Sequence, residues 1–358
     1  MKTKLIALML AFAILLGLSA CGGGQGAQPT GSSAPETRIF TDDLGRQVEI
    51  PSEITRIVPS SMLSQIILYA LAPDLFAGVA SDRYANPEGS LSAEHLALPC
   101  FGSLSAGSDL NVEELALAAP QLIIDIGEPK DSVVEEMNAL QAQTLIPSVY
   151  ISATLETMPE AYRTLGRLLG REERAEELAQ FCERIYSRTL SIIEQVGENK
   201  VNCLYVLGEQ GLNVIAATSY HAELLDLLTN NLAVVDNPLS KGSGNEVTME
   251  QIALWNPDFV IFAPDSIYGT VENTQTWNQI SAIITGSYVE VPESPYNWMS
   301  MPPSVQRYLG LIWLTAVLYP EHCDYDVKAD IMEYYQLFCG CTLSEEQYQS
   351  LTANAFLK

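Results

Sequence analysis

The chain has 358 residues, which suggests two domains at the ordinary size of about 100–200 residues each. It carries 18 Lys and Arg against 44 Asp and Glu, a net charge of −26, and this balance argues against a surface that binds nucleic-acid phosphates. Hydrophobic residues make up 47% and charged ones 17%, which is typical of a globular protein, and the three histidines disfavour a histidine-rich metal site.

The N-terminus has the pattern of an export signal. Lys2 and Lys4 precede an apolar run that ends at Ala20, which is shorter than the roughly 20 residues of a membrane-spanning helix. We therefore predict a signal peptide over residues 1–20, and an uncleaved anchor is the weaker alternative. Leu18-Ser19-Ala20-Cys21 resembles the bacterial lipobox, which implies a lipid on Cys21; the alternative is a plain signal peptide with an incidental cysteine. Residues 21–36 are rich in Gly, Ser, Pro and Gln and predict a flexible tether at the outer face of a membrane.

The next part of the chain alternates strand and helix patterns. Residues 37–51 predict a hairpin around Asp43-Leu44-Gly45, and Arg56-Ile57-Val58 predicts a strand that leads into a helix over Leu63–Leu71. Further strands are expected at Phe76–Val79, Leu122–Ile126 and Ser148–Ile151. This alternation indicates an α/β sheet.

A helical stretch then separates two similar halves. Apolar residues at steps of three and four predict helices from Thr157 to Val196, interrupted at Gly170. The second of them, Glu172–Val196, has 25 residues and would be about 38 Å long. It could join two lobes; a helix bundle is the alternative, which the surrounding strand patterns disfavour. Beyond it, strands are predicted at Asn202–Leu207, Gly211–Ala216, Phe259–Phe262 and Tyr288–Val291, and helices at Tyr220–Leu228, Thr248–Leu254, Trp277–Ile284 and Ser304–Leu318.

Two segments in the two halves match each other. Residues 111–125 and 248–262 both place a glutamate seven residues before a proline, with an apolar helix between and a buried strand after. Glu113 and Glu250 are the matched acids. Each lies in the first turn of its helix, where a carboxylate favours the helix dipole. The repetition predicts two lobes that each present one glutamate.

The sequence resembles the ferric-siderophore, cobalamin and haem family of ABC-transporter substrate-binding proteins. The resemblance rests on the two matched segments (the echo), the Asp-Leu-Gly-Arg hairpin, the long middle helix and the segment Trp313-Leu-Thr-Ala-Val-Leu-Tyr-Pro320. The likeness runs from about Thr37 to Cys341. It implies an α/β fold of two Rossmann-like lobes with central sheets, joined by one long rigid helix, as in class III substrate-binding proteins. The expected organisation is an N-terminal lobe (37–154), a connecting helical segment (155–197), a C-terminal lobe (198–342) and a tail (343–358).

The resemblance also implies partners and a site. Glu113 and Glu250 would dock on an ABC permease with its ATPase, and the protein would be a monomer on the extracytoplasmic face of the membrane. A small-molecule ligand would lie between the lobes, at the carboxyl edges of the sheets. The ligand-binding candidates are Ser60, Ser61, Met62, Arg83, Tyr84, Ser103, Tyr220, His221, Tyr268, Asn297, Trp298, Met299 and Arg307.

The residues favour a ligand that brings its own metal coordination. The loop Tyr296–Met301 is rich in aromatic and methionine side chains, which suit a flat or bulky ligand, although it could instead pack on its own lobe. Arg83 and Arg307 could meet carboxylates, and His221 could ligate haem iron or simply be a surface residue. A ferric siderophore, cobalamin or haem is therefore expected. An oxyanion such as molybdate, held by Ser60, Ser61 and Ser103 with backbone N–H groups, is the alternative.

Other functional classes find little support. The nucleophile-elbow, zinc-protease and phosphate-loop patterns are absent from the sequence, so we expect no enzymatic activity, no bound cofactor and no metal held by the protein alone. A ligand-sensing lipoprotein without a permease remains a further alternative. Six cysteines follow Cys21, and Cys323, Cys339 and Cys341 could pair or bind a metal, although a structural or inert role is favoured for them.

Overall fold

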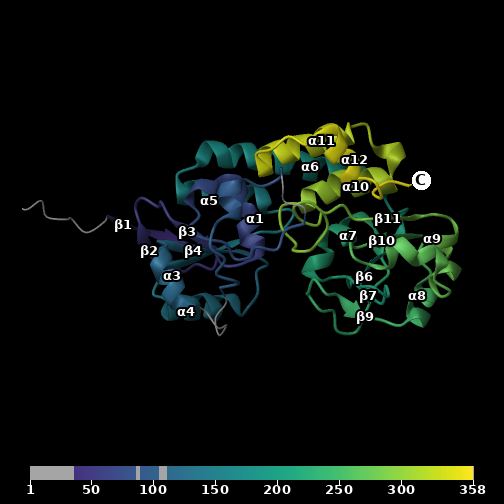
Figure 1. Cartoon of the computed structure of the whole chain (residues 1–358), viewed down its shortest axis with the longest axis horizontal. Helices are drawn as coiled ribbons and strands as arrows, with labels where there is room; N and C mark the ends of the chain where they lie inside the picture. Colours follow the sequence, from purple (N-terminus) through teal and green to yellow (C-terminus); the bar gives the residue numbers. More distant parts are fainter. Residues whose placement is uncertain (1–35, 86–88, 105–110, 358) are drawn as a thin grey trace, which may run out of the picture. The chain divides into compact units, whose positions relative to one another are not determined.

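The structure is a computed structural model, and it describes residues 36–85, 89–104 and 111–357. The predicted signal peptide, Cys21 and most of the tether lie outside the described residues. Residues 36–358 form one compact unit, and Figure 1 shows its helices and strands in chain order. Within the described part, no helix is long and apolar enough to cross a membrane.

The N-terminal lobe is built on a parallel sheet. The predicted hairpin is present as the antiparallel strands β1 (Thr37–Thr41) and β2 (Gln47–Pro51). Strands β3 (Ile57–Pro59), β4 (Leu122–Gly127) and β5 (Ser148–Ser152) form a parallel sheet in that order, with Ile57 opposite Leu122 and Ile123 opposite Ser148. They are buried almost throughout, as expected for parallel strands covered on both faces. The accompanying helices are α1 (Met62–Leu71), η1 (Pro73–Leu75), α2 (Ala93–Leu96), α3 (Val112–Ala118) and α4 (Val133–Thr144).

One predicted strand is absent from this lobe. Residues 76–79 form only two isolated bridges, Phe76 with Ile57 and Val79 with Cys100. A Cβ atom at Gly78 would overlap the ring of Phe101. The ring of Phe101 therefore occupies the space beside Gly78. The short apolar run is therefore a buried segment with two bridges and not a continuous strand, a difference that periodicity alone does not show.

The C-terminal lobe has a six-stranded sheet. Its main path runs β11-β10-β6-β7-β9, and β8 pairs with β6. Strands β6, β8, β10 and β11 run parallel to one another, whereas β7 is antiparallel to both β6 and β9. The strands are β6 (Asn202–Leu207), β7 (Asn213–Val214), β8 (Asn230–Asn231), β9 (Asn245–Glu246), β10 (Phe259–Phe262) and β11 (Tyr288–Glu290). The helices are η2 (Tyr220–Ala222), α7 (Glu223–Leu228), α8 (Met249–Trp255), η3 (Ile267–Asn273), η4 (Trp277–Gln279), α9 (Ser281–Ile284), α10 (Arg307–Leu318) and η5 (Pro320–His322).

The long helix predicted between the lobes is present with the expected bounds. Helix α5 (Met158–Leu169) ends at Gly170, whose φ of +66° suits glycine, and α6 runs from Glu172 to Val196. The apolar face of α6 is buried from Ala175 to Val196, where it packs against α1 of the first lobe and α10 of the second. The fold is thus two α/β lobes joined by one helix, as the resemblance implied.

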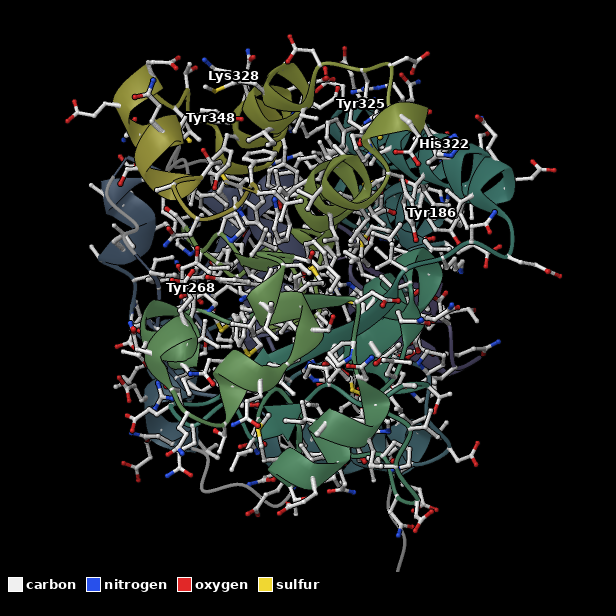
Figure 2. All side chains as sticks on the ribbon, turned by 90° about the vertical axis from the view of Figure 1, so that its right-hand side faces the viewer. Tyr186, Tyr268, His322, Tyr325, Lys328 and Tyr348 are labelled. Carbon is white, nitrogen blue, oxygen red and sulfur yellow. The ribbon has the colours of Figure 1, made fainter. Side chains whose placement is uncertain are left out.

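The residues after α10 pack back onto this framework. Helix α11 (Val327–Tyr334) continues into a π-helical turn, η6 (Tyr335–Cys339), and α12 (Glu345–Leu351) follows. Asp330 of α11 is nearly buried and forms ion pairs with Arg184 and Arg188 of α6. The ammonium group of Lys328 lies 5.1 Å from the ring centre of Tyr348, which joins α11 to α12 (Figure 2).

Candidate functional site

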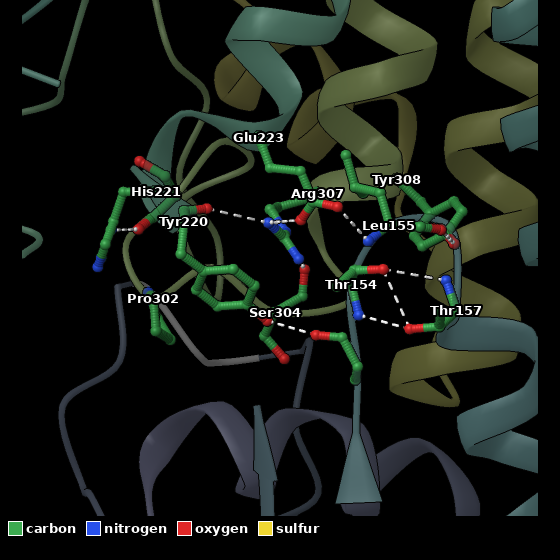
Figure 3. A network of polar contacts seen from close by, with 12 residues as sticks. Thr154, Leu155, Thr157, Tyr220, His221, Glu223, Pro302, Ser304, Arg307 and Tyr308 are labelled. Atoms are coloured by element: carbon green, nitrogen blue, oxygen red, sulfur yellow. Dashed lines mark hydrogen bonds and ion pairs between the residues drawn. The ribbon is translucent and has the colours of Figure 1, made fainter. Parts of the chain in front are cut away.

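A buried arginine lies where the second lobe meets the first. Arg307 begins α10 and has no exposed surface. Its Nη1 atom is 2.7 Å from Glu223 Oε2, its Nε donates to the carbonyl of Ser304 at 3.3 Å, and its guanidinium lies 4.9 Å from the ring centre of Tyr220 (Figure 3). Nη2 has no hydrogen-bond partner among the described residues. An unpaired buried donor costs about 1–3 kcal/mol, and because Arg307 has no exposed surface, Nη2 offers a ligand no contact in this conformation.

Four hydrogen bonds join the lobes around this arginine. The hydroxyl of Tyr220 donates to the carbonyl of Ala153, and that of Tyr308 to the carbonyl of Leu155, both at 2.6 Å. The N–H of Leu155 donates to Glu223 Oε1 at 2.8 Å. The fourth bond is donated by Ser304 Oγ to the carbonyl of Leu63 at 2.9 Å. We call the region joined by these four bonds the seam. The carboxylate of Glu223 thus holds both Arg307 and the chain that leaves β5, which positions the first turn of α10 against the first lobe.

His221 is oriented by the loop that precedes α10. Its Nδ1 atom lies 2.7 Å from the carbonyl oxygen of Ser300, and since a carbonyl only accepts, Nδ1 carries the proton. Burial lowers the pKa of His221, and the positive charges of Arg307 and Lys130 lower it further against the opposing bond to Ser300. The ring is therefore neutral near pH 7, and Nε2 has a lone pair without a partner among the described residues (Figure 3).

The first lobe contributes a cluster of serines at the carboxyl ends of β3 and β4. Ser61 caps α1 by accepting the N–H of Ser64, and Ser60 donates to the carboxylate of Asp125. Burial raises the pKa of Asp125 against the effect of this bond. Ser103 donates to the carbonyl of Ser60 at 3.5 Å, so the structure brings together the three predicted serines, with Met62 beside them as the first residue of α1.

The aromatic and methionine loop differs from the expectation. Asn297, Trp298 and Met299 are buried to 0%, 0% and 1% exposure, and the rings of Trp298 and Trp313 are 6.3 Å apart. Asn297 Oδ1 accepts the N–H groups of Met299 and Ser300. These side chains form the core of their own lobe and shape the loop, so they offer a ligand no contact in this conformation. An apolar loop before Pro302 was equally consistent with either placement, and burial decided it.

The remaining candidates make contacts elsewhere. Arg83 is exposed, and Tyr84 accepts a hydrogen bond from Gln65 and lies 5.9 Å from Tyr296. Tyr268 packs against the rings of Phe262 and Tyr288. Within the described part of the chain, none of the ring or hydrogen-bond contacts of these three residues involves Tyr220, His221 or Arg307.

Two residues of the seam were absent from the sequence predictions. Glu223 is 84 positions from Arg307, and no local pattern connects them. Lys130 follows the carboxyl end of β4 and lies 3.6 Å from Glu128. A lone lysine beside a strand end, in a chain with so few cations, was a signal that could have been used. In the described residues, no group of three or more His, Cys, Asp and Glu could hold a metal ion.

The two matched glutamates lie on helices of the same construction. α3 and α8 each have seven residues, begin at a side-chain cap (Asn111 and Thr248) and end at a left-handed residue. Residues 111–120 and 248–257 have the same sequence of buried and exposed positions. Glu113 and Glu250 are both exposed, and one turn later Leu117 and Leu254 are 87% and 85% exposed. The echo in the sequence therefore corresponds to a repeated surface.

Comparisons with known proteins agree with this architecture. A model of the periplasmic binding protein family matches residues 67–295, more than half of the chain. An ABC transporter solute-binding protein from Sulfurospirillum deleyianum is 28% identical, with a TM-score of 0.80 over 88% of this chain and 99% of that one. The molybdate-binding protein MolA of Haemophilus influenzae is 23% identical over 86% of this chain and 92% of its own length. The catecholate-siderophore binding protein VctP of Vibrio cholerae has the same fold, with 17% identity and a TM-score of 0.56 over 77% of this chain and 99% of its own.

The family match covers the first lobe from the middle of α1 onward, the connecting helix, and the second lobe as far as Pro295, before α10. The structural likeness extends over nearly the whole described unit. The chain belongs to the periplasmic binding protein family, the extracytoplasmic solute-binding proteins that work with ABC permeases.

Proposed function

We propose that this protein captures a negatively charged metal chelate, such as a ferric siderophore or haem, and delivers it to an ABC permease. The observation that carries the proposal is the environment of His221. Its Nε2 lone pair is free among the described residues, while Nδ1 is held by Ser300. A neutral imidazole with one nitrogen fixed by a backbone carbonyl is the form that ligates metals.

The charges around His221 support an anionic ligand. Arg307 and Lys130 are close enough to lower the pKa of the imidazole, although the chain as a whole has a net charge of −26. Arg307 is paired with Glu223 and Lys130 with Glu128, so an anion would be attracted by these two cations only at short range, in competition with the carboxylates. The chelate would supply most of the metal coordination, and His221 would add one ligand.

A molybdate-like oxyanion is the second candidate. Ser60, Ser61 and Ser103 supply hydroxyl groups in the first lobe. The similarity to MolA over most of both chains adds support. Against it, the neutral form of His221 presents a lone pair, which repels an oxyanion unless the ring gains a proton.

The same proposal covers the anchor and the permease. Cys21 would carry the lipid that holds the protein at the membrane, and Glu113 and Glu250 would meet positive residues of the permease. The repeated geometry of α3 and α8 supports this pairing, because a partner with two equivalent faces needs two equivalent contacts.

A titration of the purified chain tests the ligand class. Ferric hydroxamate and catecholate siderophores, haemin, cobalamin, molybdate and tungstate would each be added while absorbance and tryptophan emission are recorded. We expect one chelate to saturate, and His221→Gln to weaken its binding about tenfold, roughly 1.4 kcal/mol, with a change in the metal-centred absorbance. His322→Gln is the matched control, since His322 lies outside the seam beside Glu321.

The outcomes separate the two candidates. Saturable binding of molybdate that weakens in Lys130→Gln and with added salt, but is unchanged in His221→Gln, would replace the chelate by the oxyanion. If no chelate and no oxyanion binds, the ligand assignment is wrong while the family membership is unaffected.

A further inference from the structure

Two cysteine thiols lie together at the end of the π-helical turn η6. Cys339 is the last residue of the turn, and Gly340 follows with a φ of +67°, which a residue with a side chain rarely adopts. The chain therefore reverses, and the N–H of Cys341 donates to the carbonyl of Tyr335 at 3.2 Å. This reversal places Cys341 on the same turn as Cys339, with the Cys341 thiol donating to the carbonyl of Tyr335 at 3.9 Å.

The pair is accessible from a cavity. Cys339, Gly340 and Cys341 line a cavity of about 770 Å³, together with His95, Arg171 and Arg174. Both cysteines are partly exposed, whereas Cys182 and Cys203 are fully buried. A reagent in the cavity can therefore reach two cysteines that are separated by one residue.

The two thiols are not equivalent. The neighbouring Cys339 lowers the pKa of Cys341, while the neighbouring Cys341 and burial raise the pKa of Cys339. Because the thiolate is the reactive form, Cys341 is the nucleophile of the pair and Cys339 is the thiol placed to react second.

We propose that Cys339 and Cys341 form a redox-active pair that exchanges with external disulfides. The Cys341 thiolate attacks one sulfur of a disulfide, the S–S bond of that disulfide breaks, and the first thiol leaves as a thiolate that takes up a proton. Cys339 then loses its proton and attacks the Cys341 sulfur, which releases the second thiol. The two cysteines are oxidised to a disulfide, and one external disulfide is reduced to two thiols. The chain belongs to a family of extracytoplasmic proteins, and disulfides persist in the oxidising environment outside the cytoplasm.

Oxidised glutathione is the probe for this exchange. The full chain, reduced and then freed of reductant, would be incubated with it, and the cysteines mapped by mass spectrometry after alkylation. We expect a Cys339–Cys341 disulfide without retained glutathione. The exposed Cys100, which serves as the internal control, should retain glutathione as a mixed disulfide. In Cys339→Ser, Cys341 should retain glutathione too, since the second thiol is gone.

Alkylation provides a readout that does not depend on any variant. At neutral pH, iodoacetamide should modify Cys341 several-fold faster than Cys339, and the rate at Cys341 should level off below pH of about 8.5, the ordinary cysteine value. The proposal is overturned if Cys339 and Cys341 stay reduced while Cys100 is glutathionylated, or if Cys341 retains glutathione with Cys339 present. Either result can be obtained on the unsubstituted chain, so misfolding of a variant does not affect the test.

Discussion

His95 is a buried titratable group that makes the stability of the first lobe sensitive to acid. It is 3% exposed, its ring lies 4.5 Å from that of Tyr69 and 5.2 Å from that of Phe76, and its Nδ1 has no partner among the described residues. Burial lowers its pKa to about 4. A histidine in the unfolded chain binds a proton below about 6.5, whereas native His95 does so only below about 4, so the unfolded state holds more protons between these values. The free energy of unfolding is therefore unaffected by His95 above about pH 6.5, and it falls as the pH decreases toward 4, by up to about 3 kcal/mol.

The measurement is urea unfolding of the wild type and of His95→Gln between about pH 7 and pH 4.5. Titrating carboxylates contribute to both proteins and cancel in the difference. We expect the wild type to lose more stability on acidification than the variant, whatever their difference at pH 7. Equal losses would show that the proton uptake of His95 does not differ between the folded and unfolded states.

Helices α3 and α8 present matched apolar residues as well as matched acids. Leu117 and Leu254 are almost fully exposed, which is unusual for leucine at equivalent positions of two repeated helices. If these helices dock on the permease, each leucine would bury its side chain there for about 1–2 kcal/mol. We expect Leu117→Ser and Leu254→Ser each to weaken binding to the reconstituted permease about tenfold, with ligand binding unchanged.

Leu145→Ser is the control for this surface, because Leu145 is also 87% exposed but lies at the end of α4. Equal effects of all three substitutions would indicate a general change in solubility and would remove the docking assignment from α3 and α8. An effect of Glu113→Lys and Glu250→Lys without an effect of the leucine variants would restrict the contact to the charges.

Sequence patterns predicted the elements well where the periodicity was long or repeated. The bounds of α6 follow from apolar residues spaced over 25 positions and from Gly197 at its end, and the echo located α3 and α8. The candidate site was harder to predict from the sequence because its contacts join residues that are far apart in the chain. Glu223 and Arg307 both belong to the second lobe but are 84 positions apart, so they meet only when that lobe folds. The sequence did not show whether the loop that holds Trp298 contacts a ligand or packs in the core, because a tryptophan suits both places. Its packing on Trp313 places it in the core.

The last residues of the chain complete the second lobe. The indole N–H of Trp313 donates to the carbonyl of Ala355 at 2.6 Å, and Asn354 is joined to Glu290 of β11 by two hydrogen bonds. Trp313 is fully buried. The sequence patterns separated residues 343–358 as a tail and supported no functional claim for it, because no periodic pattern links the residues after α12 to a helix more than 30 positions earlier.

A chain ended at Thr352 tests how far the whole molecule depends on these contacts. It lacks Asn354 and Ala355, so the buried Trp313 N–H loses its acceptor, which costs about 1–3 kcal/mol, and the indole ring gains exposure to water. We expect a lower midpoint in urea unfolding and a red shift of tryptophan emission. A chain ended at Phe356 keeps both contacts and should match the full chain. If the two truncations unfold alike, the second lobe does not need its C-terminal residues. If only the chain ended at Thr352 is less stable, the C-terminal residues stabilise the second lobe although no sequence pattern predicted it. They would then also support Arg307, because Trp313 and Arg307 lie on the same helix, α10.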